Sequence, residues 1–172
     1  LGSGGSTLNA VTANIFEYVK NKATTEEVQS DCAYYSAICA IHLNQINADE
    51  KMESFIKEFP TSSKQNQAYI EISHYYFEQG KYPQALEWFD RVDESVLSYD
   101  ELDRYNFQKG YVYFTVKNTS EATKYFNKVI NSKTYGSQAK YYLGYMSYET
   151  DDYKSANQYF EQVSDQDKYK EK

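Results

Sequence analysis

The sequence predicts an all-α fold built from a repeated antiparallel helical hairpin, and three observations lead to that prediction. Helix-breaking residues are scarce, because the 172 residues include only 2 prolines and 7 glycines, and Gly2, Gly4 and Gly5 lie at the very start. Long helices are therefore expected over the rest of the chain. The second observation is an internal repeat. The third is that apolar residues recur at helical spacing inside that repeat, without the alternation typical of strands.

The internal repeat is anchored by four alanines, spaced by 37, 37 and 34 residues: Ala48, Ala85, Ala122 and Ala156. Large apolar residues follow each alanine at helical spacing: Met52, Phe89, Phe126 and Phe160, and then Phe55, Val92, Val129 and Val163. Twelve residues before each alanine stands a small residue: Ser36, Ser73, Gly110 or Gly144. We expect each small residue to face the alanine of its unit and let two helices approach closely. Each unit is then an antiparallel hairpin.

Turn and cap residues support these helix boundaries. Gly80 suits the left-handed position that follows a helix, and Pro83 suits the first turn of the next one. Pro60 is expected to close the second helix of its unit. Capping-box spacing occurs at two predicted helix starts, Thr24 with Glu27 and Ser98 with Glu101.

Small residue, tyrosine, alanine and phenylalanine at these spacings resemble the tetratricopeptide repeat (TPR). The motif residues of the best unit are Ser73, Gly80, Tyr82, Ala85, Phe89 and Val92, and those of the last unit are Leu143, Gly144, Tyr153, Ala156, Phe160 and Val163. The resemblance implies a TPR solenoid, a right-handed superhelix of antiparallel helical hairpins, in which Tyr82 and Tyr153 pack between helices. Lys109 departs from the family, which usually buries leucine there, and Gln45 and Thr119 replace the loop tyrosine. We expect local distortion at these units.

The expected organisation is one array with short ends. Residues 1–6 are predicted to be a linker or cloning scar, residues 7–165 a single TPR array, and residues 166–172 a polar tail. The array comprises a leading helix at 7–22 and repeats at about 29–60, 66–97, 103–134 and 137–168. Solenoids need polar caps to stay soluble, and neither end is predicted to have one. We therefore expect a piece of a longer array, or self-association through apolar faces at Phe16 and Phe160.

Residues that carry chemistry are few and scattered. The 2 histidines, His42 and His74, lie in different units, and no HExxH, GxSxG, GxxxxGK[ST] or CxxC motif occurs. Cys32 and Cys39 are seven residues apart on a predicted helix, roughly 10 Å by helical rise, which is too far for a disulfide. The sequence thus predicts a protein that is not an enzyme, with no catalytic residue, metal site or cofactor.

Net charge and composition indicate which classes of partner and which cellular compartment to expect. The net charge of -7 disfavours nucleic acid, and no apolar run is long enough for membrane insertion. Tyrosine-rich TPR arrays are similar to Gram-negative cell-envelope proteins, including Tol-Pal accessory proteins and outer-membrane assembly lipoproteins. This resemblance implies a bacterial periplasm or cell envelope, with the cytoplasm left open.

In TPR superhelices the first helix of each unit lines a concave groove. The resemblance places nine residues in that groove: Ile70, His74, Phe77, Phe107, Tyr111, Phe114, Tyr141, Tyr145 and Tyr148. The lysine, asparagine and arginine set of carboxylate-clamp TPR domains is missing. The rings either bind a protein or peptide segment or pack internally. The leading hypothesis is a non-enzymatic protein–protein interaction scaffold, and the alternatives are a glycan-contacting accessory module or a structural spacer in a multi-repeat protein.

Overall fold

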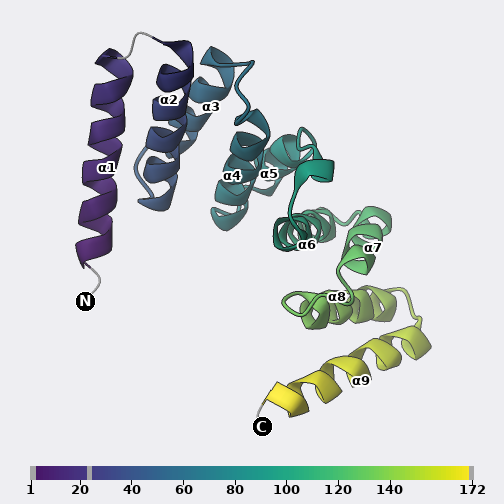
Figure 1. Ribbon diagram of the computed structural model, residues 1–172. Helices are drawn as coiled ribbons and strands as arrows, with labels where there is room; N and C mark the ends of the chain where they lie inside the picture. Colours follow the sequence, from purple (N-terminus) through teal and green to yellow (C-terminus); the bar gives the residue numbers. More distant parts are fainter. Residues whose placement is uncertain (1–2, 23–24, 171–172) are drawn as a thin grey trace. The chain divides into compact units, whose positions relative to one another are not determined.

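The computed structural model describes residues 3–22 and 25–170, and the side chains of residues 9–22 and 25–165. Over these residues the chain forms nine α-helices and one short 3-10 helix, and no strand (Figure 1). The predicted all-α fold of helical hairpins is confirmed. The chain divides into two compact units, Leu1–Val92 (unit 1) and Asp93–Lys172 (unit 2).

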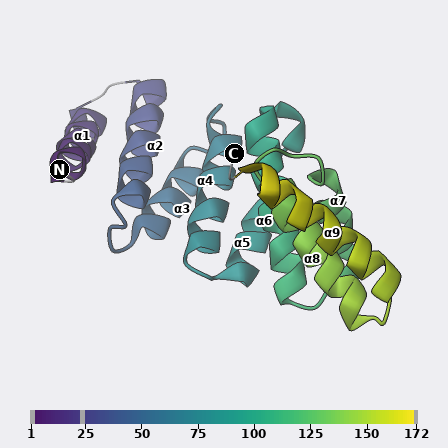
Figure 2. The same cartoon turned by 90° about the horizontal axis from the view of Figure 1, so that it is seen from below.

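Unit 1 holds the first five helices: α1 (Ser3–Lys22), α2 (Glu26–His42), α3 (Ala48–Glu58), α4 (Gln65–Glu78) and α5 (Tyr82–Phe89). Consecutive helices pack on one another, so α2 lies between α1 and α3, and α4 pairs with α5 (Figures 1 and 2). Ala48, Met52 and Phe55 of α3 are almost completely buried. The repeat residues found in the sequence therefore form the core between these helices.

Unit 2 holds a short 3-10 helix, η1 (Glu94–Val96), and four α-helices: α6 (Tyr99–Thr115), α7 (Thr119–Lys128), α8 (Gly136–Glu149) and α9 (Tyr153–Lys170). α6 and α7 form one hairpin, α8 and α9 form another, and α7 packs on α8. The core joins Ala122, Phe126 and Val129 with Leu143 and Met146.

The ends of the helices differ from the sequence prediction in two places. α1 begins at Ser3, so residues 3–6, predicted as linker, are helical. α9 continues through Lys170, into the stretch predicted as a polar tail. A polar residue lowers the stability of a helix by less than about 1 kcal/mol relative to alanine, so polarity alone does not end a helix.

The predicted caps have mixed outcomes. Ser98 and Glu101 form a capping box, in which each side chain bonds to the other residue's backbone N–H. Thr24 lies outside the described residues, and the N-cap of α2 is Thr25, whose side chain makes no capping bond. Pro83 stands in the first turn of α5, as predicted.

The hairpins of the four repeat units, α2–α3, α4–α5, α6–α7 and α8–α9, turn in the same way. The residue at the turn is left-handed in each: Asn44 (φ 48°), Gly80 (φ 70°), Lys117 (φ 62°) and Asp151 (φ 63°). The next N–H donates to the carbonyl five residues back, from Lys81 to Tyr76 at 2.9 Å and from Asn118 to Tyr113 at 2.9 Å, with equivalent bonds in the other two hairpins. This is the Schellman motif. The distortion expected near Gln45 takes the form of a second left-handed residue, Asn47, whereas the turn before Thr119 is regular.

The two glycines of the first helices in unit 2 lie against aromatic rings of the second helices. A Cβ atom on Gly110 would have the Phe126 ring as its nearest neighbour, and a Cβ atom on Gly144 would meet the Phe160 ring. The rings of Phe126 and Phe160 therefore lie directly over these glycines, beside the buried Ala122 and Ala156 of the same helices. Helical side chains lean toward the N-terminus, so the ring that follows each alanine reaches back over the contact point.

Candidate partner-binding surface

The nine predicted groove residues differ widely in exposure. Ile70, His74 and Phe107 are buried, and Phe77, Tyr111 and Phe114 are partly buried. The exposed residues are Tyr141 (50%), Tyr145 (37%) and Tyr148 (57%). All three exposed residues belong to α8. Among the nine predicted residues, the exposed ones therefore all lie in unit 2.

In unit 1, the predicted groove residues take part in packing. The His74 ring lies edge-on to Phe89 with centroids 5.8 Å apart, and Phe77 contacts Tyr82 at 5.6 Å. Ile70 is almost completely buried. These side chains hold α4 and α5 together, and they leave little ring surface exposed on this hairpin.

In unit 2, the rings of α6 and α8 form a cluster centred on Tyr142. Its ring centroid lies 5.0 Å from Phe114, 5.4 Å from Tyr111 and 5.4 Å from Phe126. Tyr142 was not among the predicted site residues, because it does not occupy one of the groove positions that the resemblance implies; the equivalent residue of the preceding repeat is Gln108. No repeat signal marks it. Only the approach of α6 to α8 identifies it as the base of the surface.

The exposed tyrosines of α8 stand on this base. Tyr141, Tyr145 and Tyr148 occupy successive turns of one helix face, which we name the α8 aromatic face. Tyr145 rests against Phe114 at 5.8 Å, and Tyr141 contacts Tyr142 at 5.4 Å. Tyr141 and Tyr145 therefore rest on packed rings, whereas the ring contact of Tyr148 is with the exposed Tyr153.

The two loop tyrosines do not both pack between helices. Tyr82 is partly buried, but Tyr153 is 58% exposed, so the expectation for Tyr153 was wrong. The Tyr153 hydroxyl donates to Asp151 at 2.7 Å, and its ring contacts Tyr148 at 5.6 Å. The hydrogen bond to Asp151 raises the pKa of Tyr153. This ring therefore extends the exposed tyrosines of α8.

Lys109, which replaces a leucine of the family motif, is buried and has aromatic neighbours. Its Nζ donates to the Tyr105 hydroxyl at 3.0 Å and lies 5.0 Å from the centre of the Tyr125 ring. Ring faces attract ammonium groups and tyrosine oxygens accept their hydrogen bonds. The lysine is accommodated in the core of unit 2 without distorting α6.

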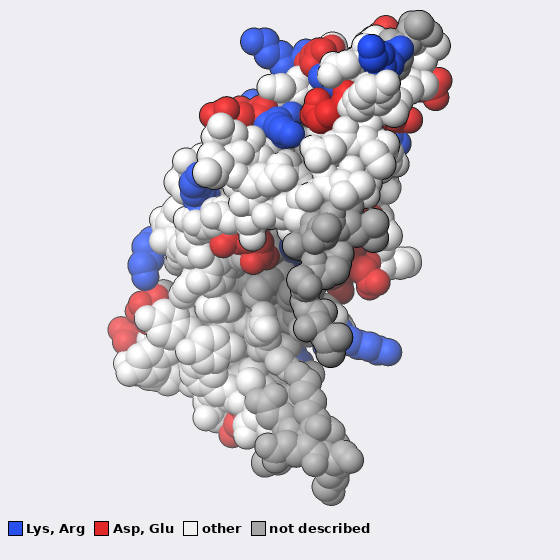
Figure 3. Space-filling view, turned by 90° about the vertical axis from the view of Figure 1, so that its left-hand side faces the viewer, with Lys and Arg blue, Asp and Glu red and all other residues white. Residues whose placement is uncertain are grey.

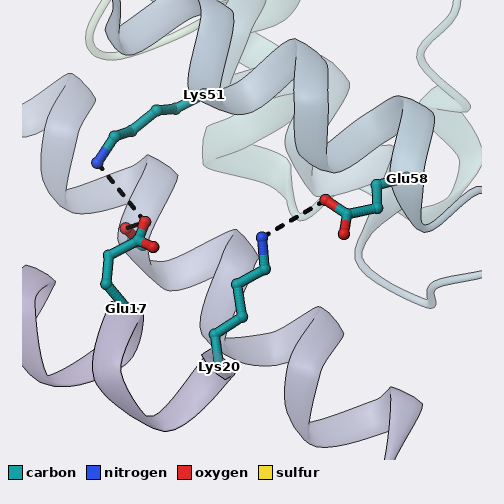
Figure 4. A network of polar contacts seen from close by, with 5 residues as sticks. Glu17, Lys20, Lys51 and Glu58 are labelled. Atoms are coloured by element: carbon teal, nitrogen blue, oxygen red, sulfur yellow. Dashed lines mark hydrogen bonds and ion pairs between the residues drawn. The ribbon is translucent and has the colours of Figure 1, made fainter. Parts of the chain in front are cut away.

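A polar network in unit 1 joins α1 to α2 and α3 (Figure 4). The Ser36 hydroxyl donates to Glu17 at 2.6 Å, Lys51 pairs with Glu17 at 3.6 Å, and Lys20 pairs with Glu58 at 3.4 Å. The Ser36 bond is the main cause that lowers the pKa of Glu17. These groups line a hollow of about 340 Å³. Their charges are paired, so the network serves to position helices.

The histidine and cysteine side chains do not lie together in one site. His42 is exposed and His74 is buried, on different helices. Cys32 and Cys39 are free thiols whose pKa values are raised by burial. Across the described part of the chain, no three His, Cys, Asp or Glu side chains gather to hold a metal ion. Charged side chains of both signs are interspersed on the face shown in Figure 3.

Membrane insertion by a helix is not supported by any described element. None of the helices between residues 3 and 170 combines the length and the apolar character that crossing a bilayer requires.

Comparison with known proteins identifies one repeat and the fold. The family model described as tetratricopeptide repeat matches residues 103–134, which contain most of α6 and all of α7. That segment is the third repeat expected from the sequence. No curated protein matches the chain.

Two solved structures share the fold. The crystal structure of MamA superposes with a TM-score of 0.70 at 16% identity, covering 92% of this chain and 88% of that chain. A structure of MamA AMB-1 gives a TM-score of 0.71 at 13% identity, covering 94% and 89%. The chain therefore contains a tetratricopeptide repeat and has the all-helical fold of MamA.

Proposed function

We propose that this chain is a non-enzymatic scaffold that binds a segment of a partner protein on the aromatic surface of α6 and α8. The single observation that carries this proposal is the α8 aromatic face, in which Tyr141, Tyr145 and Tyr148 stay exposed above a packed layer of rings. The tetratricopeptide repeat at residues 103–134 supports a role in protein–protein interaction.

The geometry suits binding because the rings are partly immobilised before a partner arrives. Tyr145 rests against the partly buried Phe114, and Tyr148 contacts the exposed ring of Tyr153. A ring that is already ordered loses less conformational entropy on binding, and tyrosine offers apolar area with a polar tip. Such residues are frequent among those that dominate interface energies.

The proposal that the chain is not an enzyme is supported by the separation of its reactive groups. His42 and His74 lie on α2 and α4 and differ in exposure, and Cys32 is buried. Catalysis requires nucleophile, base and oxyanion donors within hydrogen-bond reach. Protein or peptide partners, rather than nucleic acid, also fit the net charge of -7.

We also propose that copies of the chain self-associate, through exposed apolar residues of α1. Phe16 stacks on Tyr35 at 5.3 Å, and Phe160 contacts Tyr141 at 6.0 Å. Both rings therefore already pack within the chain. Exposed apolar residues instead follow one stripe of α1: Val11, Ile15, Tyr18 and Val19. This stripe supports weak association between copies.

The cellular context is proposed from composition. The 20 tyrosines and the resemblance to Gram-negative envelope TPR proteins support a place in a longer protein of the bacterial envelope. Fractionation of the native protein tests this, and recovery in the cytoplasm alone would contradict it.

The binding function is tested by selecting ligands from a random peptide library and measuring their affinity for wild-type protein and for Tyr145→Ala. We expect selected peptides to lose about tenfold or more in affinity with this variant, since central aromatic anchors contribute about 2 kcal/mol. Tyr99→Ala is the control, because Tyr99 is exposed at the start of α6. Binding of an oligosaccharide panel in place of peptides would favour the glycan-contacting module, and no binding at all would favour the spacer.

A further inference from the structure

We propose that the C-terminal end of α8 is a docking corner for a basic protein segment, with arginine or lysine side chains as the recognised groups. The corner comprises Tyr145, Tyr148, Glu149, Asp151 and Tyr153, which we name the acidic tyrosine corner. The inference deepens the proposed function and depends on it, because it states which partner chemistry the exposed tyrosines of α8 favour.

The corner pairs each carboxylate with a tyrosine hydroxyl. Tyr145 is hydrogen-bonded to Glu149, and Tyr153 donates to Asp151 at 2.7 Å. The Tyr148 ring contacts the Tyr153 ring edge-on at 5.6 Å. All five side chains are exposed. Exposed ring faces and carboxylate oxygens with free lone pairs therefore occur together at one helix end.

The electrostatics of this end favour a cation. The negative end of the α8 dipole and the positive end of the α9 dipole meet at this corner and offset one another, so the charge of the side chains decides the preference. Glu149, Asp151 and Asp152 lie within four residues of one another, and Lys154 is the nearby lysine that acts on Asp152. Asp152 also accepts the Ser155 N–H at 3.1 Å as a cap of α9. A partner cation would meet surplus negative charge here, and an acidic segment would be repelled.

At two other sites the chain holds one of its own cations against a ring. Lys128 lies 4.8 Å from the centre of the Tyr125 ring, and Arg91 lies 4.3 Å from that of Trp88. Over the described residues, no lysine or arginine lies above Tyr145, Tyr148 or Tyr153. A cation held between a ring face and a carboxylate gains from both attractions. The corner offers exposed ring faces beside carboxylates, and a basic partner would supply the cation.

The test uses two defined peptides: a glycine–serine peptide carrying several arginines, and the same peptide with citrulline, the neutral isostere, at each of these positions. Affinities are measured by fluorescence anisotropy at low and high salt. We expect the arginine peptide to bind at least about tenfold more tightly than the citrulline peptide, with the difference shrinking at high salt.

Protein variants then locate the binding. Glu149→Gln and Tyr148→Ala should each weaken arginine-peptide binding about three- to tenfold. The matched controls are Asp100→Asn and Tyr99→Ala, an exposed acid and an exposed ring at the start of α6, which should leave it unchanged. Circular dichroism of every variant verifies folding.

The outcomes separate this inference from the proposed function. Equal affinity for the arginine and citrulline peptides, no binding of either, or no effect of Glu149→Gln would overturn the basic partner. If the random library then yields neutral or acidic peptides whose affinity falls with Tyr145→Ala, the proposed function stands and only the basic partner fails. If no peptide from any source binds, both fail.

Discussion

A Cβ atom on Gly110 would lie 3.0 Å from Cδ1 of Phe126, in the contact between α6 and α7. Phe126 is completely buried in the core of unit 2. The next hairpin repeats this relationship, because a Cβ atom on Gly144 would lie 2.9 Å from Cε1 of Phe160, but Phe160 is only partly buried. Because the glycine has no side chain, each ring can pack against the backbone of the first helix. Whether a larger residue fits at the glycine position depends on how far the neighbouring side chains can move.

The first prediction concerns this pair. Gly110→Ala should lower the free energy of unfolding by about 1 to 2 kcal/mol, because overpacking against an immobile ring outweighs the roughly 1 kcal/mol that alanine gains in a helix interior. Gly144→Ala is the comparison: the Phe160 ring is only partly buried, but Cβ of Tyr159 would lie 3.1 Å from the added Cβ, so this variant should lose stability as well. Urea denaturation measures both. Greater stability of Gly110→Ala would show that Phe126 is free to move.

The second prediction uses the left-handed turns. Lys117→Gly should raise stability by about 1 kcal/mol, because a non-glycine residue is penalised in this conformation. Gly80→Ala should lower it by a similar amount, and that cost is purely conformational because nothing lies within 4 Å of the added Cβ. Thermal and urea unfolding of the two variants should therefore shift in opposite directions, and a shift in the same direction would contradict the shared turn.

The third prediction separates core tyrosines from surface tyrosines on α8. Tyr142→Ala should destabilise unit 2 by about 2 to 4 kcal/mol, because it removes the ring that contacts Phe107, Tyr111, Phe114 and Phe126. Tyr148→Ala should change stability little, since Tyr148 is exposed. Differential scanning calorimetry compares the variants. Equal losses from both would place Tyr148 in the core and remove it from the binding surface.

The fourth prediction concerns alkaline pH. The Tyr76 hydroxyl donates to Glu53 at 2.8 Å and lies 3.3 Å from Asp49, and burial followed by these carboxylates raises the pKa of Tyr76. Its ordinary pKa is about 10, so the unfolded chain loses this proton first as pH rises. The stabilisation by Tyr76 is then complete below about pH 10 and declines above it.

Tyr76→Phe tests this dependence. The variant should be less stable than wild type at neutral pH, and the difference should narrow when urea midpoints are measured above about pH 10. Tyr99→Phe is the control, because Tyr99 is exposed. A constant difference across this pH range would show that the pKa of Tyr76 is the same in the folded and unfolded chains.

The fifth prediction concerns self-association. Ile15→Lys places a charge in the exposed apolar stripe of α1 and should weaken any concentration-dependent association seen by analytical ultracentrifugation. Tyr99→Lys, at an exposed site away from that stripe, should have no effect. Association that persists unchanged in Ile15→Lys would exclude the α1 stripe as the contact.

The repeat and its helices could be predicted from the sequence alone, because both depend on local spacing. The alanine Ala122, the ring of Phe126 and the glycine Gly110 recur in adjacent units at nearly constant intervals, and few breakers interrupt them. The family match to residues 103–134 falls on the repeat that this spacing predicts. Helical periodicity requires only neighbours within a few turns, so no tertiary contact was needed to find it.

The tertiary structure alone decided which tyrosines form the surface and how the hairpins turn. Tyr141 and Tyr142 are identical and adjacent in sequence, yet one is exposed and the other lies at the centre of a ring cluster, because about 100° of helix rotation points Tyr142 toward α6. Lys117 and Asp151 adopt the left-handed turn without glycine, since the packed helices on either side hold the backbone there. Both outcomes depend on how neighbouring helices meet, and that contact is absent from the local pattern of residues.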